Sequence, residues 1–377
     1  MKKAFRILLT AVLIMVISLV LVVGLAIAYL NLSPRSGKAP SGVRLERIRR
    51  SPNHGGSKFV NPVATAFGTG DESMFSSGYR WLTQSSTRSP RRPLPTGWHD
   101  RDSFVPLSGT GVTVTWFGHS TALLQFEGKN VLLDPMFSDA SSPFPFLGKR
   151  FVNDKSIPVD DLPFIDLVIV SHDHYDHLDH ESIRKIKDRV GHFVTTLGVG
   201  SHLEYWGVPA ERITELDWWQ STEVSGIQIT ATPSRHFSGR RVPESNNTLW
   251  ASWVIKGEAR NLFFSGDGGY FEGIKEIGQK YGPFDFALME CGQYNANWAD
   301  IHMTPEQAIQ AGIDVGGRLL MPIHWGAFDL SLHPWKEPPS RFADEAERLG
   351  VPVALPRIGE SFDIASPPHE RWWESLE

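Results

Sequence analysis

Cysteine is almost absent from this sequence of 377 residues, in which Cys291 stands alone. A single cysteine excludes an intrachain disulfide and any zinc site built from several thiolates. It does not decide the compartment, because a reducing cytosol and a periplasm both accommodate a chain without disulfides. An excess of positive charge is also lacking: the formal net charge is −5, so we expect no nucleic-acid partner. Histidine, in contrast, occurs 14 times, often at spacings that suit a metal.

The longest uncharged stretch lies at the N-terminus. Three basic residues precede an apolar run over residues 7–30. At ~1.5 Å per residue such a helix spans roughly 36 Å, enough to cross a hydrocarbon core of ~30 Å. A signal peptide is the alternative, because Ala26-Ile27-Ala28 resembles a cleavage site, but signal peptides usually have apolar cores of about 7–15 residues. We therefore expect residues 1–30 to be an uncleaved, single-pass membrane anchor.

The side of the membrane on which the remainder lies is left open. Basic residues between Arg35 and Arg50 outnumber those before the apolar run, which favours a cytoplasmic domain, whereas a simple signal anchor places the domain outside. The segment 31–109 is rich in Ser, Pro, Gly and Arg. We interpret it as a linker and an irregular arm that packs on the domain through Trp81 and Trp98.

From residue 110 to residue 377 the pattern changes to short apolar segments. Val112–Phe117, Leu123–Phe126 and Lys129–Leu133 are separated by glycine-containing turns, which predicts a meander of strands. Ile165–Val170 is an apolar run interrupted by a single charge, Asp166, and is typical of a buried strand. Further strands are predicted at His192–Thr196, Ile227–Thr232, Leu249–Lys256 and Asn261–Phe264, and helices at Glu181–Val190, Phe271–Tyr281, Thr304–Gly312 and Pro339–Leu349. This order favours one α/β domain with two central sheets and helices outside, an αββα sandwich.

The segment His172-Asp173-His174-Tyr175-Asp176-His177 is the sharpest local feature. It places four potential metal ligands within six residues, directly after the predicted buried strand. Strand ends and the loops beyond them are where α/β proteins bind ligands. Imidazole and carboxylate are ligands that zinc and similar divalent metals accept. A polar surface loop with a chance cluster of histidines is the alternative, but such a loop is unusual after a buried strand.

Five motifs in order carry a resemblance to a known superfamily. His172–His177 has the H-x-H-x-D-H pattern of the metallo-β-lactamase superfamily. Asp134 precedes it at the end of a predicted strand, and His236, Asp267 and His324 each follow a predicted apolar segment further along. The sequence thus resembles this superfamily, which implies its αββα sandwich, here preceded by one transmembrane helix.

Within the superfamily the chain resembles the N-acyl-phosphatidylethanolamine-hydrolysing phospholipase D group. The resemblance spans Val112 to Gly359 and is weaker at Gly292–Trp298, a region that lines the substrate cleft in that group. This departure leaves the substrate open. The matching stretches are Thr115–Ser120, Ser171–Asp179, Glu215–Trp219, Gly282–Asp285 and Ile323–Gly326.

The resemblance implies a dinuclear metal site. One metal would take His172, His174 and His236, the other would take Asp176, His177 and His324, and Asp267 would bridge them. Two zinc ions are expected, with iron or manganese as alternatives, and a hydroxide held between them would be the nucleophile. Asp134 would orient one of the ligand imidazoles.

Three nearby residues each have more than one interpretation. His302 aligns with a histidine near the phosphate in the resembled group, although a helix-capping or surface histidine also fits. His119 is either a donor that positions a ligand or a histidine satisfied within a tight turn. Asp173 is expected to face away from the metals, so that Asp173→Asn would be nearly silent. We expect Asp176, Asp267 and His302 to act in catalysis.

The function expected from these observations is a zinc-dependent phosphodiesterase of phospholipase D type, acting on membrane phospholipids that resemble N-acyl-phosphatidylethanolamine. A lactonase or another hydrolase on the same metal core is the alternative. A membrane-anchored binding protein without activity is a third interpretation, which the complete ligand set opposes. The apolar N-terminal run favours the phospholipase, because it holds the site near lipid.

Overall fold

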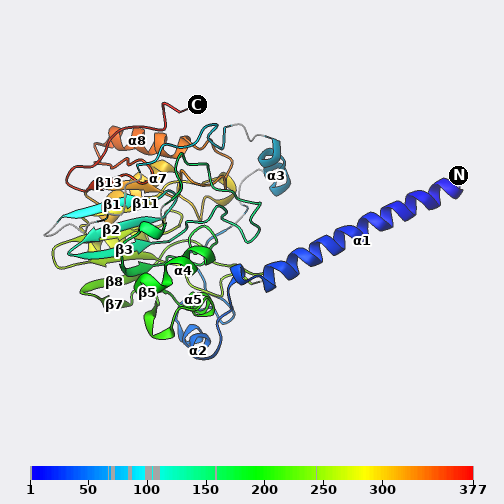
Figure 1. The fold of residues 1–377 in the computed structure, drawn as a ribbon, viewed down its shortest axis with the longest axis horizontal. Coiled ribbons are helices and arrows are strands. Elements are labelled where there is room, and N and C mark those ends of the chain that lie inside the picture. Colours follow the sequence, from blue (N-terminus) through cyan, green and yellow to red (C-terminus); the bar gives the residue numbers. More distant parts are fainter. Residues whose placement is uncertain are drawn as a thin grey trace.

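Two β-sheets packed face to face form the centre of the protein (Figure 1). The computed structural model describes residues 2–66, 68, 73–83, 87–97, 104, 111–157, 159–242 and 244–376. The first sheet contains β1 (Val112–Trp116), β2 (Ala122–Phe126), β3 (Lys129–Leu133), β4 (Ile165–Ile169), β5 (Val190–Thr196), β6 (Ile213–Leu216) and β13 (Ser361–Asp363). The second contains β7 (Ser221–Val224), β8 (Ile227–Thr232), β9 (Ser252–Lys256), β10 (Asn261–Phe264), β11 (Phe286–Glu290) and β12 (Leu320–Ile323).

Both sheets are mixed. The strand order is β13-β1-β2-β3-β4-β5-β6 in the first sheet and β12-β11-β10-β9-β8-β7 in the second. The pairs from β3 to β6 are parallel, as are the pairs joining β10, β11 and β12, and the remaining pairs are antiparallel. Parallel strands end at the same edge of a sheet, so loops that follow several of them converge there.

Strand β4 is apolar except for the half-buried Asp166, and the packing of the strand explains this composition. Leu167 and Ile169 belong to the core between the two sheets, whereas Val168 and Val170 pack into a second core on the outer face of the first sheet. A strand covered on both faces has no polar side, unlike one with a face in water. The buried strand predicted from this run is confirmed.

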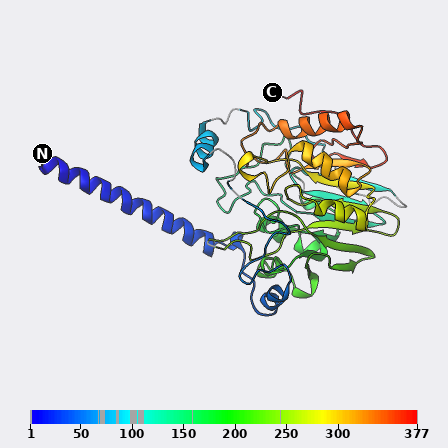
Figure 2. The ribbon, with the colours of Figure 1, turned by 180° about the vertical axis from the view of Figure 1, so that it is seen from behind.

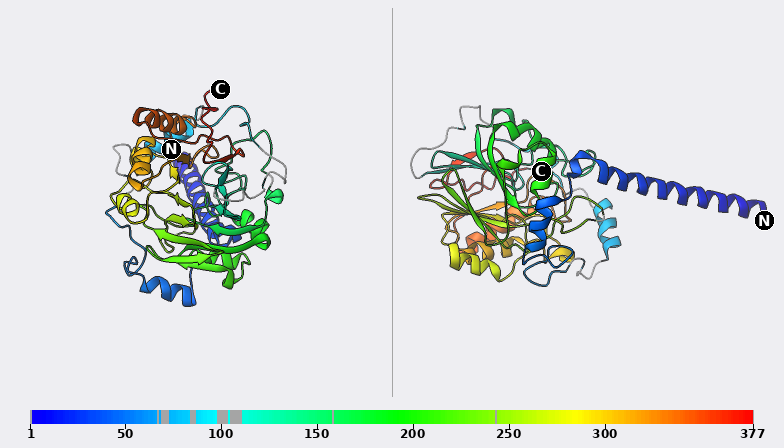
Figure 3. Two further views of the ribbon diagram at one scale, coloured as in Figure 1. Left: turned by 90° about the vertical axis from the view of Figure 1, so that its left-hand side faces the viewer. Right: turned by 90° about the horizontal axis from the view of Figure 1, so that it is seen from below.

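Helices cover both outer faces, which completes the predicted αββα sandwich (Figures 2 and 3). On the first sheet lie α4 (His180–Ile186) and α5 (Gly200–Tyr205), and on the second lie α6 (Gly273–Tyr281), α7 (Pro305–Val315) and α8 (Glu337–Leu349). Helix α7 begins at Pro305 after Thr304, whose side chain accepts a hydrogen bond from the backbone of Gln307. The helix predicted to reach Val190 ends at Ile186, because Val190 already pairs with Ile165 in the sheet.

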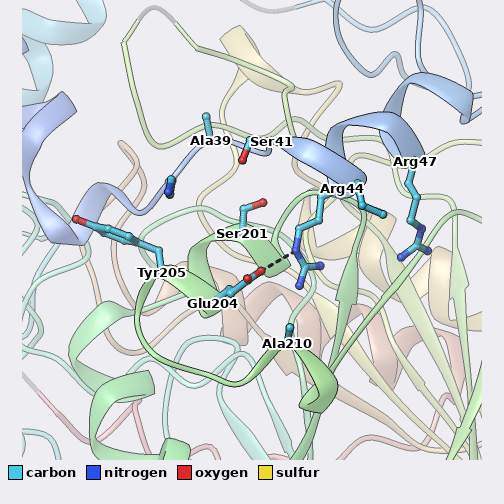
Figure 4. A pocket seen from close by; sticks show the side chains of 10 residues that line it. Ala39, Ser41, Arg44, Arg47, Ser201, Glu204, Tyr205 and Ala210 are labelled. Carbon is cyan, nitrogen blue, oxygen red and sulfur yellow. Dashed lines mark hydrogen bonds and ion pairs between the residues drawn. The ribbon is translucent and has the colours of Figure 1, made fainter.

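The segment after residue 30 is more ordered than the predicted linker and irregular arm. It contains α2 (Gly42–Arg50) and α3 (Met74–Thr83). Arg44 of α2 pairs with Glu204 at 3.2 Å and with the fully buried Glu215 at 2.8 Å, beside a cavity of about 560 Å³ between α2 and α5 (Figure 4). Trp81 is 42% exposed, with the guanidinium of the buried Arg88 5.2 Å from its ring centroid, and Trp98 lies outside the described residues.

Helix α1 (Lys2–Leu32) projects away from the sandwich (Figures 1 and 2). Lys3–Leu32 has a mean hydropathy of 3.1 in its most apolar window, none of which is buried against the rest of the protein. Its length and composition fit a membrane anchor and also a signal sequence.

Candidate metal centre

Loops at one edge of the sandwich bring together all seven residues predicted to bind metal. The loop after β4 carries four of them, and the loops after β8, β10 and β12 carry one each. All but His174 and Asp176 are buried, and those two are half-buried. The residues are His172, His174, Asp176, His177, His236, Asp267 and His324.

Three histidines form the first group of potential ligands. His172 Nε2 lies 2.8 Å from His174 Nδ1, which in turn lies 3.3 Å from His236 Nε2. Zinc–nitrogen bonds of ~2.0–2.1 Å in a tetrahedral site place neighbouring ligand atoms about 3.3 Å apart. The three nitrogens are therefore close enough to share one ion.

The second group contains Asp176, His177 and His324, with His119 beside them. Asp176 Oδ2 lies 3.5 Å from His177 Nε2 and 2.8 Å from His119 Nε2. His119 and His324 also exchange backbone contacts, because the His324 amide donates to the His119 carbonyl at 3.0 Å. Of the two interpretations of His119, the structure shows the positioning donor, since its ring holds the Asp176 carboxylate.

Asp267 contacts both groups. Its Oδ2 lies 3.0 Å from His177 Nε2 in the second group, and 3.9 Å and 3.8 Å from the Nε2 atoms of His172 and His236 in the first. Its Oδ1 lies 3.2 Å from His324 Nδ1. Oδ2 thus lies between the two ligand groups and Oδ1 faces the second, a position from which one carboxylate can serve two cations.

A hydrogen-bond network behind the ligands sets the direction of two rings. Asp134 Oδ2 accepts from His177 Nδ1 at 2.7 Å and from the Ser171 hydroxyl at 2.6 Å. The Ser171 hydroxyl oxygen lies 2.9 Å from His172 Nδ1. With the Nδ1 atoms engaged, the Nε2 atoms of His172 and His177 face the cluster, as metal-binding imidazoles require. The orienting role predicted for Asp134 is confirmed.

Unpaired atoms inside the cluster show that the residues fit a metal. His177 Nε2 and Asp267 Oδ1, which face the other ligands, are buried and make no hydrogen bond of regular geometry in the described structure. Burial and the neighbouring imidazoles hold the pKa values of His172, His236 and His324 well below the usual range, so these rings are neutral and can donate lone pairs. Burial raises the pKa of Asp267 to about 6, a cost that a bound cation would remove.

A cavity of about 250 Å³ opens onto this cluster. Six polar or charged residues line it, among them Asp176, Asp267 and His324, together with four apolar ones; the other lining residues are His174, Phe237, Gln293, Trp298, Ile301, His302 and Leu330. Gln293 and Trp298 belong to the stretch in which the sequence departs from the resembled group. That stretch therefore shapes the cavity.

His302 lies at this cavity rather than on the open surface or at a helix cap. Its ring stacks on that of His324 with centroids 5.2 Å apart, and Thr304 caps α7 instead. Its Nδ1 lies 2.7 Å from the carboxylate of Glu290, which is fully buried at the end of β11. Sequence analysis did not single out Glu290, although an acidic residue that ends the apolar run Phe286–Met289 was a usable signal.

The expectation for Asp173 is half wrong. Its side chain does face away from the ligand cluster, but it is buried and accepts hydrogen bonds from the Gly239 amide at 2.8 Å and the Thr248 hydroxyl at 2.9 Å. Its other neighbour is His202 Nε2 at 3.3 Å. Asp173→Asn would therefore disturb a buried network and would not be silent, because a buried polar group that loses its partner costs free energy.

Comparison with known proteins agrees with this geometry. A family model described as a beta-lactamase superfamily domain matches residues 129–325, a range that contains Asp134 and all seven potential ligands. The chain is a metal-dependent hydrolase of the metallo-β-lactamase superfamily.

Relatives of this chain within the superfamily come from bacteria, archaea and animals. An uncharacterised protein of Mycobacterium tuberculosis is 40% identical over 330 residues, which is 86% of this chain and 88% of that protein. The N-acyl-phosphatidylethanolamine-hydrolysing phospholipase D 1 of Caenorhabditis elegans is 34% identical over 236 residues, 59% of this chain and 66% of that enzyme. A metallo hydrolase from Ignicoccus hospitalis superposes with a TM-score of 0.53 at 22% identity, over 67% of this chain and 98% of that structure, and shows the same fold.

Asp267→Asn should weaken metal binding at both groups. The substitution removes the negative charge and one oxygen atom of the side chain that contacts both ligand groups. We therefore expect the affinity for zinc to fall about 100-fold or more. Competition with a chromogenic chelator measures the affinity, and circular dichroism checks the fold. Asp188→Asn makes the same chemical change at a carboxylate that is 79% exposed, and it should bind zinc as the wild type does. Equal affinities for Asp267→Asn and the wild type would exclude a bridging role.

Proposed function

We propose that the chain is a membrane-anchored phosphodiesterase of phospholipase D type, with N-acyl-phosphatidylethanolamine-like phospholipids as substrates. The observation that carries the proposal is the make-up of the site: two ligand groups that meet at Asp267 open onto a cavity that Phe237, Trp298, Ile301 and Leu330 also line. A phospholipid is likewise polar at its phosphate and apolar at its acyl chains. The similarity to the phospholipase D of Caenorhabditis elegans supports the same assignment.

The ligand set would hold two divalent cations, with zinc favoured by its imidazole and carboxylate atoms and iron or manganese as alternatives. Such ions supply positive charge for phosphoryl oxygens and make water a stronger nucleophile near neutral pH. Asp176 and Asp267 would hold this charge in place, while Asp134 and His119 would keep the ligands oriented. The Phe237, Trp298, Ile301 and Leu330 side chains would face the apolar part of the substrate.

His302 would contact the phosphate or the leaving group. Burial lowers the pKa of His302, so the ring is neutral near pH 7. Because Nδ1 is engaged by Glu290, Nε2 is the nitrogen left for the cavity, and it can exchange a proton there. Glu290 is in turn held by the Met303 amide, which donates to its second oxygen at 3.3 Å. Glu290 thus acts as a positioning residue for His302.

Helix α1 supplies the link to the membrane. We take it as an uncleaved anchor, because its apolar run of residues 7–30 is longer than the core of most signal peptides. Anchoring raises the rate at which the site meets bilayer lipid without changing the chemistry at the metals. An anchor and a bilayer substrate therefore fit together.

The assignment is tested by incubating the purified full-length protein with phospholipid vesicles and with soluble esters, which include phosphodiesters and lactones. N-acyl-phosphatidylethanolamine should yield phosphatidic acid and an N-acylethanolamine by mass spectrometry. In heavy-oxygen water the label should appear in the phosphatidic acid, because water attacks phosphorus. Asp267→Asn should give no product. Opening of lactones with no cleavage of any phosphodiester would contradict the proposal and favour the lactonase.

The role of Glu290 is tested by two substitutions at one position. Glu290→Leu leaves His302 Nδ1 without an acceptor and should lower kcat by about tenfold or more with little change in KM. Glu290→Gln keeps a carbonyl oxygen near that nitrogen and should recover most of kcat. Both variants should bind the same amount of zinc. Wild-type kcat in Glu290→Leu, or equal loss in both variants, would mean that Glu290 does not position His302.

A further inference from the structure

The loop that joins β3 to β4 carries an apolar tip, Pro143–Leu147. Residues 140–149 form a closed loop, because Ala140 and Lys149 pair in an antiparallel bridge and the Ser141 amide donates to the Gly148 carbonyl at 2.9 Å. Three consecutive apolar residues within this loop are exposed: Pro145, Phe146 at 66% and Leu147 at 47%. Exposed apolar residues in a contiguous group mark a surface that another apolar body covers.

The tip touches the last turn of α1. The rings of Tyr29 and Phe144 stack with centroids 5.0 Å apart, and the Tyr29 hydroxyl donates to the Pro143 carbonyl at 3.1 Å. Ala26 and Leu30, one helical turn apart on the same face of α1, are half-buried, whereas Leu25 is 69% exposed. The folded domain therefore contacts the side of the last turns of α1 as well as its C-terminal end.

This contact determines the depth of the tip if α1 spans a bilayer. The apolar run ends at Leu30, and tyrosine is enriched where a membrane meets water, so Tyr29 marks the interfacial layer. A loop that stacks on Tyr29 lies at the same depth. Val242 is a further exposed apolar residue at this level, since its backbone carbonyl accepts from Asn31 Nδ2 at 2.8 Å.

The charges beside the tip suit a phospholipid surface. A cavity of about 600 Å³ reaches from Pro145 to α4, and four of its five charged lining residues are cationic: Lys149, Arg150, Lys155 and Lys185 against Asp139. Lysine side chains near an anionic membrane surface are attracted to its headgroups. An apolar tip flanked by cations matches the bilayer interface, with acyl chains below the headgroups.

The segments before and after residues 140–149 contact the metal centre. At its start, Asp134 accepts the hydrogen bond from His177. At its end, the Phe151 amide donates to the Ala327 carbonyl at 2.7 Å, three residues after His324. Arg150 lies over the Phe328 ring at 4.6 Å, and that ring contacts His119 with centroids 5.2 Å apart. The tip therefore projects from the edge of the sandwich that carries the metal ligands.

We propose that the tip Pro143–Leu147 is a second membrane contact, which inserts Phe146 and Leu147 into the interfacial layer of the bilayer beside α1. The proposal rests on the proposed function, because it takes α1 as the anchor. Two contacts instead of one remove the freedom of the domain to turn about the helix. The edge of the sandwich with the metal ligands is then held toward the lipid.

The test uses the full-length chain in vesicles of phosphatidylcholine and phosphatidylglycerol. Phe146→Cys and, separately, Leu147→Cys are labelled with an environment-sensitive fluorophore. The native Cys291 is fully buried, so the unsubstituted protein serves as the labelling blank. Leu349→Cys, at a residue 40% exposed at the end of α8, is the matched control. Vesicles with nitroxide-labelled acyl chains report whether each probe reaches the bilayer.

The probes at positions 146 and 147 should emit at shorter wavelength than the probe at 349 and should lose more than half of their emission to the nitroxide lipids. Emission typical of water with no quenching, in a chain that stays in the vesicles after a carbonate wash, would overturn the second contact and leave the anchor intact. Release of the chain by carbonate would overturn the anchor and, with it, this proposal. Phospholipid hydrolysis is measured on the same preparation. This measurement shows whether the proposed phospholipase activity is present, independently of either membrane contact.

Discussion

One buried carboxylate, Asp267, touches both groups of ligands, and the rest of the site depends on it. The ends of three other strands supply the remaining six side chains around it, and several buried nitrogen and oxygen atoms there have no hydrogen-bond partner within the described structure. Histidines packed this closely cannot all be charged, so burial and mutual repulsion keep most of them neutral. The fold therefore holds together a set of lone pairs that a bound cation would satisfy.

The backbone is shaped for this convergence. Gly266, just before Asp267, has φ +54°, and a Cβ there would lie 2.7 Å from the Ala251 carbonyl and 2.9 Å from Ser171 Cβ. Only glycine allows the loop after β10 to pass so close to the loop after β4. His119 and His324 also have positive φ values, of 54° and 68°, which are uncommon for residues with a Cβ. Such conformations concentrate at functional sites, where the surrounding structure holds them.

The sequence predicted the ligands and the sandwich because local patterns encode them. The H-x-H-x-D-H segment, the β4 run and the Thr304–Pro305 helix start each need only neighbouring residues. Glu290 was missed because its importance comes from contact with His302 across a loop. The helices in the arm were not predicted for the same reason. Helix α2 has little apolar periodicity, and it is held on the domain by the ion pair between Arg44 and the buried Glu215, which are 171 residues apart in sequence. Contacts between distant residues are not visible in a local pattern.

The central claim is that the chain holds two metal ions in the two groups joined by Asp267. Anomalous X-ray scattering at the zinc edge, from crystals of zinc-supplied wild-type protein, tests this most directly. We predict two peaks, one among His172, His174 and His236 and one among Asp176, His177 and His324, with Asp267 between them. A well-folded protein with no peak, or with a single peak that Asp267 does not contact, would contradict the account.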